Sequence, residues 1–112
     1  MDAIDDFVDH VLGTGFDDLP PQAIRAAKTF TLDSFGVGLS GGAGPWVDEM
    51  IQLSTQWGQG DDARVWGHGL RLPAPAAALC NAYQIHNAEF DCVHEGAAVD
   101  SMTVLLGAAM AV

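Results

Sequence analysis

Basic residues are scarce in this sequence: four lysines and arginines stand against 15 acidic residues, which gives a formal net charge of −11. A chain this acidic is repelled by DNA, RNA and anionic lipid surfaces, so we expect no nucleic-acid partner. The N-terminus also lacks the basic region that opens a secretory signal, because Met1 is followed by Asp2, Asp5 and Asp6.

Long apolar runs and paired cysteines are missing as well. No segment approaches the roughly 18 consecutive apolar residues of a membrane span, so we expect no membrane association. The two cysteines, Cys80 and Cys92, have neither disulfide nor zinc-site spacing. We expect both to be free thiols in a reducing compartment, and the cytoplasm is the expected location.

The apolar pattern predicts one mainly helical domain over residues 1–112. Many of the hydrophobic residues are alanines, whose low volume suits close helix–helix contact. Helices are expected over residues 3–12, 22–40, 46–57, 76–88 and 101–112, with a short extended segment over 63–67. The first helix places Ile4, Phe7, Val8, Val11 and Leu12 on one face, and the fourth has a face with Leu79, Tyr83 and His86. The second is expected to bury a stripe, and the third is expected to face inward; their residues are Ile24, Ala27, Thr31, Leu32, Phe35 and Leu39 in the second and Val47, Met50, Ile51, Ser54 and Trp57 in the third.

The last predicted helix has no polar face. Between Met102 and Val112, Thr103 is the only polar side chain, and a helix that is apolar all round is expected to be buried on every side. It also ends without a cap or a polar tail. We therefore expect either that the natural chain continues past Val112 or that this helix is buried in a homo-oligomer.

One glycine pattern matches a nucleotide-binding motif by letter. Gly36, Gly38 and Gly41 have the spacing G-x-G-x-x-G, but that motif belongs after a strand and at the start of a helix. Here the glycines lie in the second half of a predicted helix, and no lysine follows to reach a phosphate. We interpret them as positions where another helix passes close by and where the helix ends.

Polar residues that could carry chemistry gather between positions 86 and 100. They are His86, Glu89, Asp91, His94, Glu95 and Asp100. His, Glu and Asp are common metal ligands, but the His-x-x-Glu pair occurs once and lacks the second copy of a di-metal bundle. A histidine beside carboxylates can also act as a general acid or base near neutral pH. A third interpretation is a solvated loop that caps a helix, with histidines held by neighbouring acids.

Three segments of this sequence resemble motifs of the MmgE/PrpD family. Residues 33–41 (DSFGVGLSG) are similar to its "L-D-x-x-G-V-x-L-x-G" helix, and residues 75–82 (PAAALCNA) to its "A-A-x-x-N-A/G" helix. His86, Glu89 and Asp91 then stand where the family has "H-x-x-D-F-D-D". The motifs occur in the family's order and the resemblance covers roughly residues 4 to 112.

The resemblance implies that this chain is the N-terminal part of the large all-helical domain of an MmgE/PrpD enzyme, a bundle-like piece without the α/β lid domain. The family includes 2-methylcitrate dehydratases, cis-aconitate decarboxylases and iminodisuccinate epimerases, and residues 89–95 look most like the epimerase branch. Its members are typically dimers and act on small carboxylate substrates without a metal or organic cofactor. Each reaction needs a group that removes or returns a proton next to a carboxylate. The implied catalytic residues are Glu89, Asp91, His94, Asp100 and His86.

Two departures from the family pattern affect the expected activity. Cys92 and Val93 replace the aspartate and threonine that commonly follow, and Asp100 stands where the family has the histidine of "H-P-x-[TSG]". An aspartate donates a proton near neutral pH only if burial or a like charge raises its pKa.

Cationic side chains are also missing from this stretch, although a substrate with two or three carboxylates needs them for binding. The four bases lie elsewhere, at Arg25, Lys28, Arg64 and Arg71. We therefore expect the 112-residue chain to be inactive alone and to belong to a lyase or epimerase that forms a dimer or larger homo-oligomer. The alternative is a non-catalytic helical module that associates with itself.

Overall fold

The structure is a computed structural model and describes residues 2–112. Its elements are α1 (Ala3–Gly13), a 3-10 helix η1 (Phe16–Asp18), α2 (Pro21–Gly41), α3 (Val47–Trp57), β1 (Ala63–Val65), β2 (Leu70–Leu72), α4 (Ala74–His86) and α5 (Ser101–Ala109). The predicted mainly helical fold is confirmed. No helix in the described part of the chain is long and apolar enough to cross a membrane.

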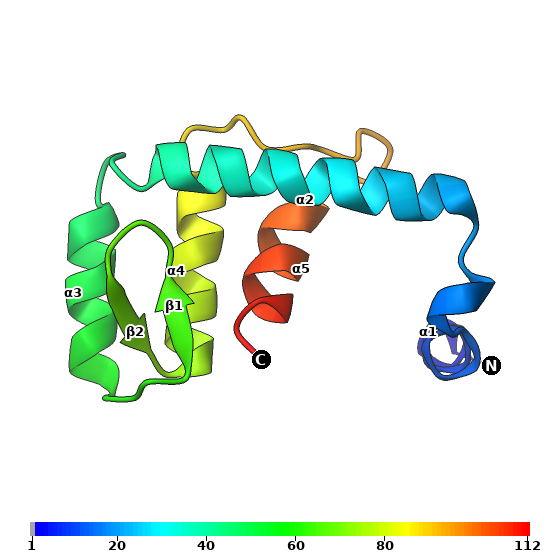
Figure 1. Cartoon of the computed structure of the whole chain (residues 1–112), viewed down its shortest axis with the longest axis horizontal. Coiled ribbons are helices and arrows are strands. Elements are labelled where there is room, and N and C mark those ends of the chain that lie inside the picture. Colours follow the sequence, from blue (N-terminus) through cyan, green and yellow to red (C-terminus); the bar gives the residue numbers. More distant parts are fainter. Residues whose placement is uncertain (1) are drawn as a thin grey trace.

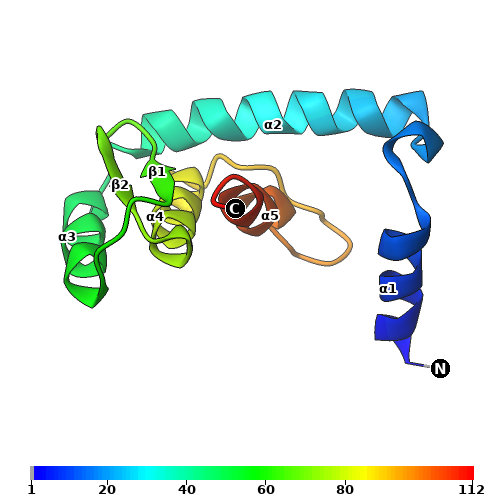
Figure 2. The same ribbon diagram turned by 60° about the horizontal axis from the view of Figure 1, so that its bottom comes forward.

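The helices are arranged around α2 and α4 (Figure 1). α2 lies across the ends of α4 and α5, while α3 and the β1–β2 hairpin flank α4 on its other side. α1 lies beyond the N-terminal end of α2, away from the other helices, and Figure 2 shows the same separation. The packed part of the molecule is therefore residues 34–112, and α1 stands outside it.

A hairpin replaces the single extended segment predicted over residues 63–67. Ala63 pairs with Leu72 and Val65 with Leu70 in an antiparallel register. The turn between the strands contains Gly67 and Gly69, both with positive φ (80° and 66°), a conformation that glycine adopts without strain. The second strand was missed because it has only three residues before Pro73. The element boundaries also shift, since α4 begins at Ala74 and ends at His86, and α5 ends at Ala109.

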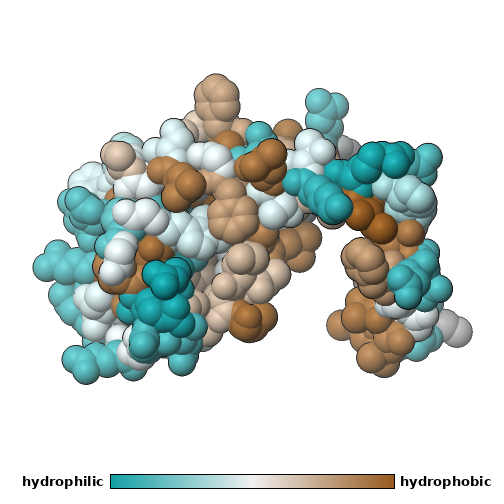
Figure 3. Space-filling model, viewed as in Figure 1, coloured by the Kyte–Doolittle hydropathy of each residue, from teal (hydrophilic) through white to brown (hydrophobic). Residues whose placement is uncertain are grey.

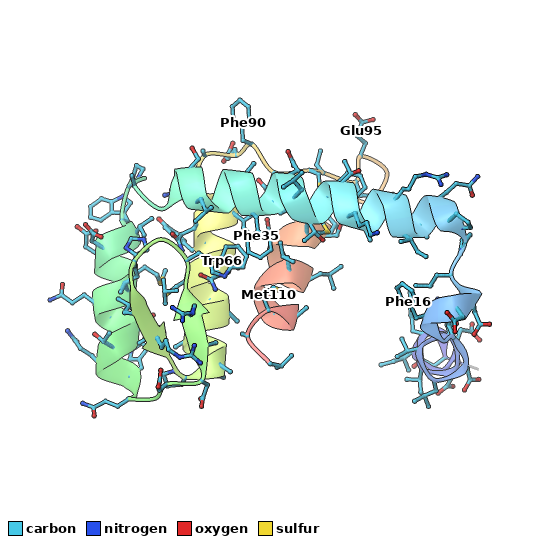
Figure 4. All side chains as sticks on the ribbon, in the orientation of Figure 1. Phe16, Phe35, Trp66, Phe90, Glu95 and Met110 are labelled. Atoms are coloured by element: carbon cyan, nitrogen blue, oxygen red, sulfur yellow. The ribbon has the colours of Figure 1, made fainter. Side chains whose placement is uncertain are left out.

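The core is small and lies where α3, the hairpin and α4 meet. Its buried members are Val47, Ile51, Ala63, Val65, Leu72, Ala77, Cys80 and Ala111. Asn81 of α4 ties the hairpin to the helix, because its side chain accepts a hydrogen bond from the backbone N–H of Trp66 (3.0 Å) and donates one to the carbonyl of Arg64 (2.9 Å). Trp66, in the turn that follows β1, packs against Phe35 of α2, with ring centroids 4.4 Å apart (Figure 4).

Glycine lets α2 approach α4 closely. A Cβ atom at Gly41 would lie 2.0 Å from the backbone oxygen of Gln84, and one at Gly38 would lie 3.1 Å from Ile85 Cγ1. Gly36 has no atom within 4 Å of its Cβ position, so the predicted helix contact is confirmed at Gly38 and Gly41 and is wrong at Gly36. All three lie inside or at the end of α2, which is not the strand–turn–helix context of a dinucleotide site.

The apolar faces of α1 and α2 are mostly exposed, so the buried stripe predicted for α2 is wrong. The apolar face of α1 is exposed, with Phe7 71% and Leu12 82% accessible, and Figure 3 shows it as a hydrophobic surface. In α2 the predicted stripe is exposed or half-buried, and Ser34, Gly38 and Gly41 are buried instead. Amphipathic periodicity identifies the apolar face of a helix but not whether an element of the same chain covers it.

The faces of the later helices also differ from expectation. α3 buries Val47, Ile51 and Ser54 as predicted and half-buries Met50, but Trp57 is 64% exposed. α4 buries its small and polar residues rather than Leu79, Tyr83 and His86; the buried set is Ala77, Cys80, Asn81, Gln84 and Ile85. α5 buries Leu106 and Gly107, whereas Val104 and Leu105 are more than 60% exposed, so this helix is not enclosed on every side.

Candidate functional site

The candidate site is formed where α4 ends and α5 begins. Gly107 of α5 lies so close to α4 that a Cβ atom there would approach the carbonyl oxygen of Ala78 to 3.0 Å and Ala82 Cβ to 3.1 Å. Small residues on both helices therefore allow them to run side by side (Figure 1). His86 is the last residue of α4 and Asp100 is the N-cap residue of α5, so this packing brings the two residues to the same end of the helix pair.

The connecting loop, residues 87–100, places Asp91 between the two helices. Its side chain is only 1% exposed, although the residue lies in a loop. His86 Nδ1 lies 3.1 and 3.2 Å from the two carboxylate oxygens of Asp91, and the hydroxyl of Thr103 donates a short hydrogen bond to Asp91 Oδ2. Asp100 Oδ2 is 3.9 Å from the same His86 nitrogen. We call these four residues the His86 cluster.

The contacts within the His86 cluster favour the charged forms of both central groups. The hydrogen bond to Asp91 raises the pKa of His86 above its ordinary value, against a smaller opposing effect of desolvation, and the charges of Asp91, Asp100 and Glu89 act in the same direction. Burial opposes ionisation of Asp91, but the hydrogen bonds from Thr103 and His86 outweigh it and lower the pKa of that carboxyl. The result is a half-exposed imidazole that gains a proton easily beside a buried carboxylate.

The structure brings together three of the five residues that the family resemblance implies to be catalytic: His86, Asp91 and Asp100. Glu89 lies near enough to raise the pKa of His86, but its backbone has a left-handed conformation (φ 51°) and the residue is exposed. His94 is not part of the cluster, because its ring nitrogen accepts a hydrogen bond from the backbone N–H of Ala97 within the loop itself.

Sequence reasoning missed Thr103 as a member of the site. The signal was present, because Thr103 is the only polar side chain between Met102 and Val112. Other side chains of the loop formed by residues 87–100 point toward solvent. Phe90 and Glu95 project away from α2 (Figure 4), and Phe90 is 80% exposed.

The charge and shape around the cluster limit what it can bind. Among the described residues no lysine or arginine forms a salt bridge with it, and Arg71 pairs instead with Asp61 (Nε to Oδ1, 2.5 Å). One groove of about 520 Å³ runs between α2 and the loop, where Asp33 and Phe90 are among the lining residues, but no member of the cluster lines it. The cluster can therefore exchange protons, but in the described part of the chain no lysine or arginine pairs with it to hold a carboxylate substrate.

Single atoms of His86, Asp91 and Asp100 lie within 4.8 Å of one another, a spacing that a cation could bridge. His86 Nδ1 is, however, the atom that bonds to Asp91, so a cation placed there would have to displace this bond.

The MmgE/PrpD N-terminal domain family matches residues 5–112. The cis-aconitate decarboxylase of Aspergillus terreus is 30% identical over 95 residues, which cover 85% of this chain and 19% of that protein. The cis-aconitate decarboxylase-like protein oryM of Aspergillus oryzae is 31% identical over 94 residues, covering 84% of this chain and 20% of that protein. The chain spans about a fifth of the length of these curated relatives, and no solved structure matches it significantly. Because the family match extends over almost every residue, this chain belongs to the MmgE/PrpD family.

Proposed function

We propose that this chain supplies the proton-transferring residues of a lyase or isomerase that acts on di- or tricarboxylates without a metal or organic cofactor. The observation that carries the proposal is the contact of half-exposed His86 with buried Asp91, in a chain whose curated relatives include a cis-aconitate decarboxylase. Loss of CO₂ or of water next to a carboxylate requires a group that gives or takes a proton at carbon or oxygen.

His86 is the proposed proton carrier. Its pKa is raised by the hydrogen bond to Asp91, so near neutral pH it can hold a proton and release it within one cycle. Asp100, which stands where the family has a histidine, lies with Oδ2 3.9 Å from Nδ1 of His86, and its charge helps to raise the pKa of that ring. We propose that His86 takes over the acid–base work in this chain.

Substrate binding is proposed to depend on lysine or arginine side chains, none of which pairs with the cluster in the described residues 2–112. We therefore expect the isolated chain to be inactive toward cis-aconitate, 2-methylcitrate and iminodisuccinate. The test compares it with the protein encoded by the complete reading frame that contains these residues. Turnover of one of the three substrates by that protein, and of none by the isolated chain, is the expected result; appreciable turnover by the isolated chain would overturn this part of the proposal.

Self-association is proposed from the exposed apolar faces. Phe7, Val11 and Leu12 of α1 and Val104 and Leu105 of α5 are mostly accessible, and surfaces of this kind usually mark a protein interface. We expect a dimer or larger homo-oligomer in sedimentation equilibrium. The same observation favours the alternative function, a non-catalytic self-associating module, which would be supported by stable oligomers without turnover of any of the three substrates by the complete protein.

The free thiols of Cys80 and Cys92 support a reducing compartment, and the cytoplasm is the proposed location.

A further inference from the structure

The surroundings of Asp91 suggest a role for a residue that the proposed reaction does not use directly. The Asp91 side chain has two hydrogen-bonding neighbours from different helices: His86 from the end of α4 and Thr103 from the first turn of α5. An ionised carboxylate only accepts hydrogen bonds. Both neighbours must therefore donate, and the nitrogen of His86 that faces Asp91 must carry a hydrogen.

This requirement fixes the tautomer of the neutral imidazole. With the hydrogen on Nδ1, the lone pair lies on Nε2, and Nε2 becomes the atom that can accept a proton. The His86 side chain is 49% exposed while that of Asp91 is 1% exposed, so the ring is held on its buried side and remains accessible on the other.

Thr103 determines how Asp91 presents its oxygens. Its hydroxyl donates to Oδ2 rather than to the carbonyl one turn earlier in the helix, which is the usual partner of a helical threonine. With Oδ2 engaged by α5, rotation of the carboxylate is restrained, and both oxygens stay within 3.2 Å of His86 Nδ1. The orientation of the ring is thereby tied to α5, whose own position depends on the close contact of Gly107 with α4.

We propose that Thr103 is a positioning residue that acts through Asp91 to hold His86 in the tautomer with hydrogen on Nδ1 and Nε2 free to exchange a proton with substrate. The inference rests on the proposed function for the role of Nε2, but the tautomer itself is a property of the folded chain. Thr103 does not contact the reacting atoms.

The test is long-range ¹H–¹⁵N NMR of the histidine rings in the 112-residue chain, with His86 assigned by its loss in His86→Gln. Above the pH at which His86 deprotonates, the native chain is expected to show one dominant tautomer with hydrogen on Nδ1. Thr103→Val, which removes the hydroxyl at nearly constant volume, is expected to give a mixture of tautomers. Thr103→Ser is expected to restore the native signature, and Thr55→Val, which removes an exposed threonine hydroxyl of α3, is expected to leave it unchanged.

Each outcome decides the matter. Hydrogen on Nε2 in the native chain would overturn the proposal whether or not the Thr103 variants fold. A Thr103→Val chain that is folded and keeps the native tautomer would show that Asp91 needs no help from Thr103, and would overturn it as well. Because no turnover is measured, failure of the proposed reaction leaves this test unaffected, and failure of this test leaves the activity assay unaffected.

Discussion

Gly41→Ala tests the helix-packing interpretation of the glycine pattern more sharply than any other single change. The added Cβ atom would lie 2.0 Å from the backbone oxygen of Gln84, whereas ordinary van der Waals contacts of a Cβ atom begin at 3.4 Å. This oxygen belongs to the backbone of α4 and cannot rotate away. α2 and α4 would have to separate by about 1.4 Å, from 2.0 to 3.4 Å, which disturbs the contacts of Gly38 with Ile85 and Trp66.

The expected cost is about 2–3 kcal/mol of the free energy of unfolding, at the upper end of what overpacking a well-packed core costs. For a domain of this size that loss lowers the melting temperature by about 10 °C. Gly36→Ala is the matched control, because it makes the same chemical change in the same helix with no atom within 4 Å. Alanine is the better helix former by about 1 kcal/mol, so Gly36→Ala should be more stable than the native chain.

Chemical denaturation followed by circular dichroism measures both variants under one set of conditions. Opposite signs for the two substitutions are the expected outcome. If Gly41→Ala unfolds at the same denaturant concentration as the native chain, α2 does not cross α4 at the close distance described here. If Gly36→Ala is destabilised as much as Gly41→Ala, the glycines share some role other than helix packing.

Four further predictions concern single groups. Ser34→Ala should raise the free energy of unfolding by about 1 kcal/mol, because the Ser34 hydroxyl is buried without a hydrogen-bond partner among the described residues; a loss of stability would mean that it has one. Glu89→Gly should be neutral or stabilising by up to about 1 kcal/mol, since φ at Glu89 is 51° and glycine adopts this conformation freely; a clear loss would point to a contact of the Glu89 side chain. The His86–Asp91 pair should stabilise the chain most between about pH 4 and 6.5. Because folding raises the pKa of His86, its contribution is complete below pH 6.5 and is lost as the pH rises through the pKa of the folded state. Because folding lowers the pKa of Asp91, its contribution is present above pH 3.8 and is lost as the pH falls through the pKa of the folded state. Subtracting the pH profile of His86→Gln should isolate this contribution of about 0.5 kcal/mol, the size expected for a partly exposed pair, and a difference that grows above pH 8 would have the wrong sign. Chelation of divalent metals should leave turnover by the complete protein unchanged, and loss of turnover that added metal restores would contradict a metal-free reaction.

The fold class and most helices could be predicted from the sequence because their signals are local. Glycine and proline mark the ends of α2 and the start of α4, and the apolar spacing of α3 matches the residues that it buries. Burial on α1 and α2 could not be predicted in the same way, because an apolar face such as that of Phe7 and Leu12 does not reveal what covers it. The buried face of α4 could not be predicted for a different reason. Asn81 and Gln84 are buried because they hydrogen-bond to the hairpin and to each other, and apolar periodicity does not detect such residues.

The sequence predicted which stretch of the chain holds the candidate site, but not which of its side chains contact one another. The i, i+3 spacing of His86 and Glu89 would put them on one helix face only if the helix continued to Glu89, whereas α4 ends at His86 and Glu89 has a left-handed backbone. The partner of His86 is Asp91, which becomes buried only because α5 packs beside α4 and offers it the hydroxyl of Thr103. That contact joins residues 12 positions apart across a loop, and no helical or strand period connects them.

The central claim is that His86 carries the proton in a carboxylate reaction, and the most direct measurement is kcat of the complete protein for cis-aconitate with His86→Gln. The control is His10→Gln, the same substitution at an exposed histidine of α1. We predict that His86→Gln lowers kcat by at least about 100-fold, the usual contribution of a general acid or base, while His10→Gln leaves it unchanged. A His86→Gln enzyme that turns over at the native rate would contradict the account.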